Sequence, residues 1–170
     1  AGIEYDVVYD PGQTYSHVLW IARFADMDVI FDESCEDNIT TERLHADIIA
    51  RCTALGRGPS AFVVDRAVTR ERRWAWEAFP QTQVMICESR GEQSVREGVS
   101  IVKSLLDPMI GDPRVRWASY LWDRMPRRAI VKCMMHYSYD RTAGGALSNQ
   151  PRKDNVFDHG ADCVRMWAMK

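Results

Sequence analysis

A chain of 170 residues has the size of one domain and can bury one substantial core. Its composition, 46% hydrophobic and 27% charged, is that of a globular protein and excludes a disordered or fibrous one. The net charge of −2 gives no overall attraction to nucleic acid, so any contact with DNA must come from local basic clusters. No apolar run approaches the roughly 20 residues of a membrane-spanning helix and no signal peptide begins the chain, so we expect a cytosolic protein without membrane contact.

The first part of the chain predicts three strands joined by short polar turns. A β-branched and aromatic run from 4 to 10 stops at Pro11-Gly12, and residues 16–25 and 28–32 predict the second and third strands. Connections this short favour an antiparallel meander.

A helix and a buried strand follow. Residues 38–42 supply helix-capping side chains, and apolar residues recur at helical spacing from Leu44 to Leu55. The run AFVVD, residues 61–65, is typical of a central strand, and the arginine-rich segment up to Pro80 predicts another helix.

The second half of the chain alternates predicted helices with short apolar runs. Residues 84–87 predict a strand, and residues 92–106 and 130–137 predict helices. The glycine-rich stretch 142–155 predicts a loop or a hairpin, and the last helix begins near Asp158. This order predicts an α/β domain with a mixed sheet, its first three strands antiparallel, flanked by α-helices.

Cysteine usage excludes two kinds of stabilisation. The five cysteines are odd in number and contain no CxxC pair, so neither a disulfide framework nor a zinc site is indicated. We expect reduced, mostly buried thiols at Cys35, Cys52, Cys87, Cys133 and Cys163.

Three aspartates occupy positions from which their carboxylates can converge. Asp10 ends the first strand, Asp65 ends the buried fourth strand, and Asp162 lies one turn inside the last helix. The first and fourth strands of a mixed sheet can be neighbours, and a helix packed across the sheet can bring the third carboxylate. Such a group binds Mg²⁺ or Mn²⁺, and two ions about 3.5–4 Å apart activate water and stabilise the leaving oxygen of a phosphodiester.

Most of these acidic residues also have a structural interpretation. Asp10 precedes Pro11-Gly12 and can be a turn residue, Asp65 can cap the next helix, and Asp158 stands where an N-cap belongs. Asp162 lies past the first helical turn, so capping does not explain it.

The histidines differ in their neighbours. His159 lies three residues before Asp162, and Asp158 lies four before it, so the three side chains project from about one side of the helix. His159 is therefore interpreted either as a ligand, proton shuttle or water-orienting group, or as a structural residue. The other histidines have no acidic or cysteine partner at metal-binding spacing and are expected to be structural: His17, His45 and His136.

Together, VVYDPG with Asp10, FVVDRA with Asp65 and DHGADCVRM with Asp162 resemble the C-terminal nuclease domain of the large terminase subunit of tailed bacteriophages and herpesviruses. The resemblance covers nearly the whole chain and implies a ribonuclease H-like fold. Cys163 stands where the family usually has alanine, a small-for-small change. The segment SRGEQSVREGVSIVKSLL resembles the family's basic stretch and following helix, with Arg90 near the usual lysine.

The resemblance implies a metal-dependent endonuclease that cleaves double-stranded DNA with low sequence specificity during viral genome packaging, by in-line hydrolysis with two divalent cations, Mg²⁺ or Mn²⁺. Asp10, Asp65 and Asp162 would be catalytic and ligate the ions, with Asp158 as a further metal ligand and His159 as a further catalytic residue. Basic residues expected to contact DNA phosphates are Arg66, Arg70, Arg90, Arg152 and Lys153.

Two further stretches match the family more loosely. Glu33 lies where the family often has an acidic residue, but we expect a solvated glutamate at the sheet edge. Residues 142–155 resemble a loop or hairpin that in the family lies beside the active site and regulates access to it.

The start at Ala1 and the lack of a Walker motif predict that residues 1–170 are a single nuclease domain, the isolated C-terminal half of a longer terminase chain without its ATPase motor. The implied partners are double-stranded DNA and, in the full-length protein, an ATPase motor domain, the portal and the small terminase subunit. The implied location is the host cytoplasm, or the nucleus for a herpesvirus, with transient docking on the procapsid.

Three alternatives stay open at this point. Residues 10–14 fit the D-x-G-x-T phosphate loop of actin- and Hsp70-like nucleotide-binding modules, although that class needs more chain and a second glycine-bearing loop. A Holliday-junction resolvase or transposase would share the metals and bind different DNA. A binding module that kept the fold and lost activity is the third.

Overall fold

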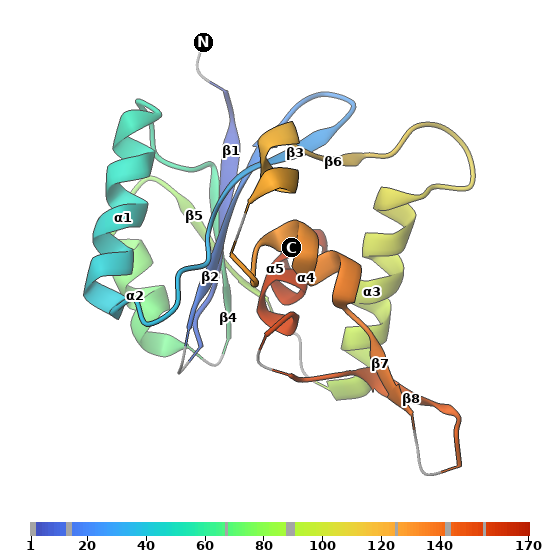
Figure 1. The fold of residues 1–170 in the computed structure, drawn as a ribbon. Helices are drawn as coiled ribbons and strands as arrows, with labels where there is room; N and C mark the ends of the chain where they lie inside the picture. Colours follow the sequence, from blue (N-terminus) through green and yellow to red (C-terminus); the bar gives the residue numbers. More distant parts are fainter. Residues whose placement is uncertain are drawn as a thin grey trace.

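A six-stranded mixed sheet, in the order β5-β4-β1-β2-β3-β6, runs through the centre of the molecule (Figure 1). The computed structural model describes residues 3–12, 15–66, 68–87, 91–124, 126–141, 144–154 and 156–170, with the backbone alone at 91, 92, 140, 147, 149 and 150. The strands of the sheet are β1 Tyr5–Asp10, β2 His17–Arg23, β3 Asp28–Ser34, β4 Ala61–Asp65, β5 Gln83–Cys87 and β6 Val115–Trp117.

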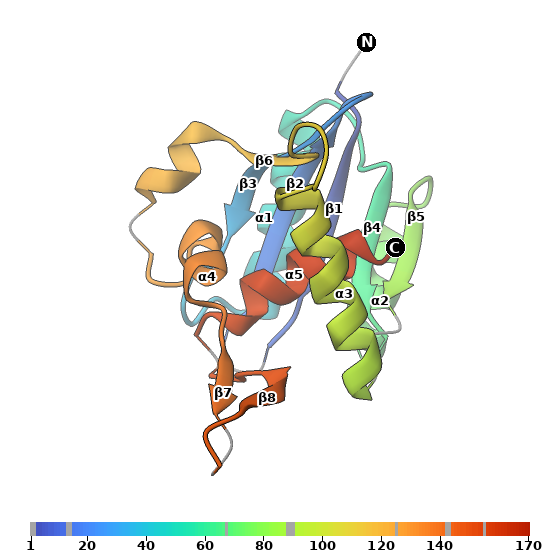
Figure 2. The same cartoon turned by 90° about the vertical axis from the view of Figure 1, so that its right-hand side faces the viewer.

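Helices cover both faces of this sheet. One face carries α1 and α2, while the other carries α3, α4 and α5, and Figure 2 shows α5 lying across the sheet with α3 and α4 on either side of it. The helices are α1 Thr41–Ala54, α2 Thr69–Ala78, α3 Gly91–Leu106, the 3-10 helix η1 Ser119–Asp123, α4 Ile130–His136 and α5 Asp158–Ala168.

Strand β1 sits at the middle of the sheet and is buried on both sides. It pairs antiparallel with β2 and parallel with β4, and β2 pairs antiparallel with β3. Alternate residues of β1 point to opposite faces, so Val7 joins the core under α1 and α2, whereas Val8 joins the core under α3, α4 and α5. Asp6 and Asp10 share the face of Val8 and therefore point toward α5.

Helix α5 is held against β1 at both of its ends. Near its start, His159 Nδ1 lies 2.7 Å from Asp10 Oδ2. Near its end, Trp167 Nε1 donates to Asp6 Oδ2 at 3.1 Å, and the ammonium of Lys170 contacts the same oxygen. The position of α5 along β1 is thus set by two polar contacts, with apolar packing between them.

Most predicted elements are confirmed, including the α/β class, the mixed sheet and the antiparallel arrangement of the first three strands. All five cysteines are free and buried, as expected. Two short elements, β6 and η1, carry no hydrophobic pattern long enough to predict them. Among the described residues, no helix combines the length and the apolar character needed to cross a membrane.

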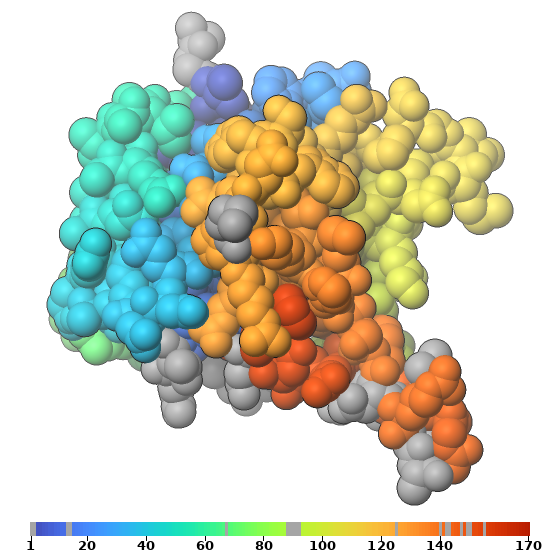
Figure 3. Space-filling view, viewed as in Figure 1, coloured from blue at the N-terminus to red at the C-terminus, as the bar shows by residue number. Residues whose placement is uncertain are grey.

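A hairpin joins β7 Tyr139–Arg141, just before the glycine-rich stretch, to β8 Leu147–Pro151, which lies within it, and projects from the body of the molecule in Figure 3. Residues 142, 143 and 155 of this stretch lie outside the described residues. The hairpin leads directly into the segment that precedes α5.

The prediction that Asp158 is the N-cap of the last helix is wrong. Phe157 occupies the cap position without a side-chain hydrogen bond, and Asp158 is the first helical residue. The amides of Val156 and Phe157 donate instead to Asp154 Oδ1, at 2.9 and 2.8 Å. Because Asp154 accepts the hydrogen bonds of the turn before the helix, the Asp158 carboxylate is not needed for capping.

Gly160 lets α5 approach α4 and β2 closely. A Cβ at this position would lie 2.9 Å from Cys133 Sγ and 2.9 Å from His17 Cε1, closer than unbonded atoms tolerate. The glycine therefore has a packing role inside the helix, where it otherwise costs helix propensity.

We expect Gly160→Ala to destabilise the protein. The overpacking costs about 1–3 kcal/mol, and the gain of about 1 kcal/mol in helix propensity does not offset its upper range. The free energy of unfolding in urea should fall, whereas Gly58→Ala, where the nearest atom is Thr82 Oγ1 at 3.5 Å, should be close to neutral. Equal stability of the two variants would contradict this account.

Candidate metal centre

Asp10 and Asp65 lie at the same edge of the sheet, on neighbouring parallel strands. The register pairs Val8 with Val63 and Tyr9 with Val64, so Asp10 and Asp65 follow as the next residues of β1 and β4. Alternation along the strands puts both on the face that α5 covers, because Val8 and Val63 belong to the core on that face. The predicted neighbourhood of the first and fourth strand ends is therefore confirmed.

Asp162 comes to this edge from α5 and is 8% exposed. Its Oδ1 accepts from Arg165 Nε at 3.2 Å and from the Tyr137 hydroxyl at 3.4 Å, and Arg165 Nη2 also lies 3.2 Å away. The ammonium of Lys153, just before the helix, contacts Oδ2. Each oxygen of this carboxylate thus has a cationic partner.

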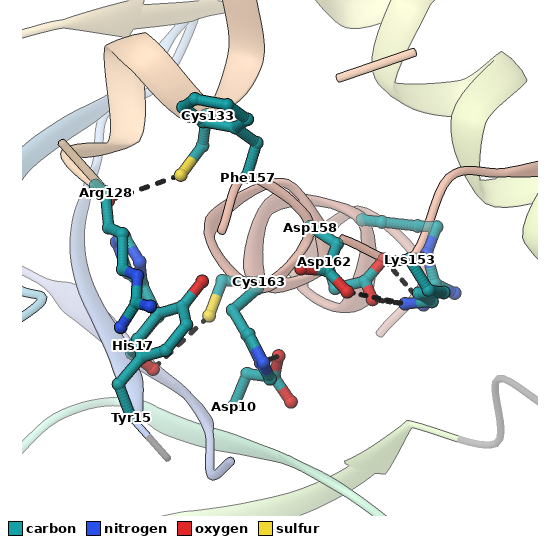
Figure 4. A network of polar contacts seen from close by, with 12 residues as sticks. Asp10, Tyr15, His17, Arg128, Cys133, Lys153, Phe157, Asp158, Asp162 and Cys163 are labelled. Carbon is teal, nitrogen blue, oxygen red and sulfur yellow. Dashed lines mark hydrogen bonds and ion pairs between the residues drawn. The ribbon is translucent and has the colours of Figure 1, made fainter. Parts of the chain in front are cut away.

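Asp158 lies one turn before Asp162 and shares Lys153 with it (Figure 4). The Lys153 Nζ atom is 3.9 Å from Asp158 Oδ2. The other oxygen, Oδ1, is buried and has no hydrogen-bond partner among the described residues. A buried carboxylate oxygen without a donor is costly, since its hydration is lost without replacement.

His159 connects α5 to Asp10, and an aromatic ring packs against its imidazole. Tyr15 packs edge-on against it with 4.5 Å between ring centroids, and the Tyr15 hydroxyl donates to the Val156 carbonyl at 2.8 Å. On its other face the Tyr15 ring carries the Arg128 guanidinium, 3.6 Å from the centroid. A Cβ at Gly12 would come 2.9 Å from the His159 ring, so the turn after β1 needs glycine here.

The Asp10–His159 pair binds a proton more tightly than the two separate groups would. Burial raises the pKa of Asp10, and the hydrogen bond with His159 only partly offsets this. Burial acts to lower the pKa of His159, but the hydrogen bond and charge of Asp10 outweigh it and the pKa is raised. The contact thus favours a protonated imidazole beside the carboxylate.

Four carboxylates at this edge supply the hard oxygen donors that Mg²⁺ and Mn²⁺ prefer: Asp10, Asp65, Asp158 and Asp162. Across the ranges that the structure describes, no three acidic, histidine or cysteine side chains are arranged closely enough to hold an ion as they stand. Two observations nevertheless fit a cation, namely the unpartnered Asp158 Oδ1 and the ammonium of Lys153 between two carboxylates. The donor set fits a divalent ion, and binding one requires these side chains to rearrange.

The basic residues predicted to contact DNA are distributed unevenly. Arg66 follows Asp65 directly and is exposed, as are Arg152 and Lys153 beside α5. Arg70 is farther along in α2 and pairs with Glu42 at 2.8 Å. Arg90 lies outside the described residues, as do Gln13 and Thr14 of the alternative phosphate loop.

The expectation of a solvated Glu33 is wrong, because its side chain is fully buried. Its Oε2 accepts from the Ile130 amide at 2.6 Å and lies 3.2 Å from His17 Nε2, while Arg124 Nε lies 3.2 Å from Oε1. Glu33 thus joins β2 and β3 to the start of α4, and His17 is structural, as expected, but has an acidic partner. No sequence spacing indicates this cluster, since its members are far apart in the chain.

The mixed sheet and its strand order confirm the predicted ribonuclease H-like α/β fold, and similar solved structures share it. No model of a known protein family matches the sequence, and no curated protein matches it either. Among solved structures, the large terminase of thermophilic bacteriophage D6E in complex with ATP-γ-S has a TM-score of 0.76 at 14% identity, over 99% of this chain and 40% of that one.

Two isolated domains are similar as well. The nuclease domain of the bacteriophage SPP1 large terminase with bound Mn has a TM-score of 0.60 at 13% identity, over 98% of this chain and 84% of that one. The Thermus phage P74-26 large terminase nuclease domain has a TM-score of 0.66 at 15% identity, over 96% and 77%. The chain therefore has the fold of large terminase nuclease domains, and it spans about 40% of the length of the D6E protein.

We expect Glu33→Ala to destabilise the protein by about 3–5 kcal/mol, because it leaves His17, Arg124 and the Ile130 amide without their buried partner. Urea unfolding followed by circular dichroism measures the loss. Glu36→Ala, at an exposed position three residues on, should change the stability by about 0.5 kcal/mol or less. A loss of similar size in both variants would contradict a buried cluster.

Proposed function

We propose that this chain is a divalent-metal-dependent endonuclease that cleaves double-stranded DNA during viral genome packaging. The observation that supports the proposal is the position of Asp10 and Asp65 at one strand edge, on the sheet face covered by the helix α5 that carries Asp162, in a chain whose fold is that of terminase nuclease domains. A ribonuclease H-like fold alone hosts several activities, so the acidic edge is the stronger part of the argument.

Each group at the site has a distinct task in phosphodiester hydrolysis. Asp10, Asp65 and Asp162 hold two divalent cations, which when bound activate water and neutralise charge on the phosphate. Asp158 offers its unpartnered oxygen as a further ligand. His159, whose Nδ1 lies 2.7 Å from Asp10 Oδ2, would hold a proton at the site, and no covalent bond to the protein is needed.

Related structures support the choice of ions and of the larger assembly. The SPP1 domain was solved with Mn and a phage G20c terminase nuclease with magnesium, and we propose that either ion serves this chain. The D6E protein was solved with ATP-γ-S and ADP, in keeping with an ATPase motor domain in the full-length protein. The portal and the small subunit would be its partners, and the host cytoplasm or nucleus its location.

We expect Asp65→Asn and Asp162→Asn to lose Mn²⁺-dependent nicking of supercoiled plasmid, because each removes a negative ligand from the ions. EDTA should abolish the activity of the unaltered protein. Asp26→Asn, an exposed aspartate in the β2–β3 turn at the other end of the sheet, should retain it. Circular dichroism checks that all variants are folded, and full activity in either site variant would refute the assignment.

We expect DNA binding to weaken steeply as salt rises, since phosphate contacts release counterions. Arg66→Ala should lower the slope of log affinity against log salt by about one, because Arg66 lies exposed beside Asp65. Arg57→Ala, in the loop before β4 at the far end of the sheet, should leave the slope unchanged. Fluorescence anisotropy of a labelled duplex with Ca²⁺ in place of Mn²⁺ measures both, and binding indifferent to salt would contradict phosphate contacts.

A further inference from the structure

Lys153 lies where a cation would bind two of the site carboxylates. Figure 4 shows its ammonium beside both carboxylates. It contacts Asp162 Oδ2 and lies 3.9 Å from Asp158 Oδ2. The side chain of Lys153 is 59% exposed, whereas those of Asp158 and Asp162 are 4% and 11% exposed. One exposed positive group therefore neutralises two nearly buried negative ones.

Asp158 and Asp162 require a positive charge nearby because their carboxylates repel each other. They are four residues apart on α5, so their carboxylates repel each other across one helical turn. Burial increases this repulsion because less water screens it. Lys153 offsets it incompletely, since Asp158 Oδ1 keeps no partner within the described part of the chain.

The two cationic partners of Asp162 differ in how easily a bound ion could displace them. Arg165 holds Oδ1 and is only 6% exposed, packed inside the helical layer. Lys153 holds Oδ2 from the surface, through a long stem in the segment between β8 and α5. A cation that ligates Asp162 Oδ2 therefore competes with the exposed Lys153 and not with the arginine, which is held by its packing.

We propose that Lys153 is the resident cation of the Asp158–Asp162 pair, which a divalent ion displaces when it binds. The proposal rests on the proposed function, since it assumes that these carboxylates ligate metal. Lys153 thus lowers the apparent affinity of the site for metal and keeps the acidic pair neutralised until the ion arrives. This contact with the carboxylates is a separate role from the phosphate contact that the sequence predicts for Lys153.

The test measures Mn²⁺ binding directly, by the electron paramagnetic resonance signal of free Mn²⁺ during titration of the protein. Lys153→Met keeps the length of the stem and removes the charge, and it should bind Mn²⁺ about three- to tenfold more tightly than the unaltered protein. Lys153→Gln should behave in the same way and guards against a folding defect in the first variant. Lys153→Arg retains the charge and should stay close to the unaltered protein.

Lys103→Met is the matched control, since it removes the same charge from an exposed position in the last turn of α3. It should leave Mn²⁺ affinity unchanged. Unchanged or weaker binding by Lys153→Met and Lys153→Gln would overturn the proposal, and so would an equal gain in Lys103→Met, which would indicate a general charge effect.

The outcome separates this inference from the proposed function. Tighter Mn²⁺ binding without plasmid nicking would support the role of Lys153 and refute the nuclease. Nicking that depends on Asp162, with no effect of Lys153 on Mn²⁺ affinity, would do the reverse. Absence of Mn²⁺ binding in every variant at millimolar ion would refute both.

Discussion

The clamp between β1 and α5 is the constraint on which the rest of the site depends. Asp6 and Asp10 are four residues apart on one face of the strand, and each receives a polar group from the helix. Because both contacts are buried or nearly so, sliding the helix by one turn would leave at least one carboxylate unpaired at a cost of several kcal/mol. The distance of Asp162 from the strand edge is therefore determined by contacts made elsewhere along the helix.

Positively charged side chains stabilise the carboxylates of the acidic edge, and they are unevenly distributed among them. Asp10 contacts the imidazole of His159. Asp162 contacts the buried guanidinium of Arg165 and the exposed ammonium of Lys153, whereas Asp158 has the ammonium of Lys153 alone. The partners differ in how easily they can leave, since the arginine is packed and the lysine is exposed. If a divalent ion displaces Lys153 as proposed, the other partners of these carboxylates would keep their arrangement.

The sequence predicts the parts of this structure that depend on local pattern. Strand ends at Asp10 and Asp65 follow from apolar runs that stop at an acidic residue, and the buried face of α5 follows from apolar spacing around Asp162. The features that the sequence does not predict depend on contacts between residues far apart in the chain. Glu33 looks like a surface residue because its partners come from β2, from the residue after η1 and from the start of α4, and nothing in those segments of the sequence indicates a contact with β3.

Two further errors have the same origin. Asp158 has the residue type and position of a helix cap, but Asp154 already satisfies the amides before the helix, and single-residue shifts at helix ends leave no mark in composition. Strand β6 has three residues and pairs only with the start of β3, so its existence depends on the sheet edge that it covers. The helix cap and strand β6 both depend on tertiary contacts, which the local sequence pattern does not contain.

The clamp also determines when the site can exist. Asp10 and His159 are 149 positions apart, and Asp6 and Trp167 are 161 apart, so these contacts are among the least local in the chain. During synthesis β1 and β4 emerge long before α5, so the strand edge has only two of its carboxylates until α5 has left the ribosome. A nascent chain that lacks α5 therefore has an incomplete acidic edge, and the proposed metal site would form only once α5 has been made.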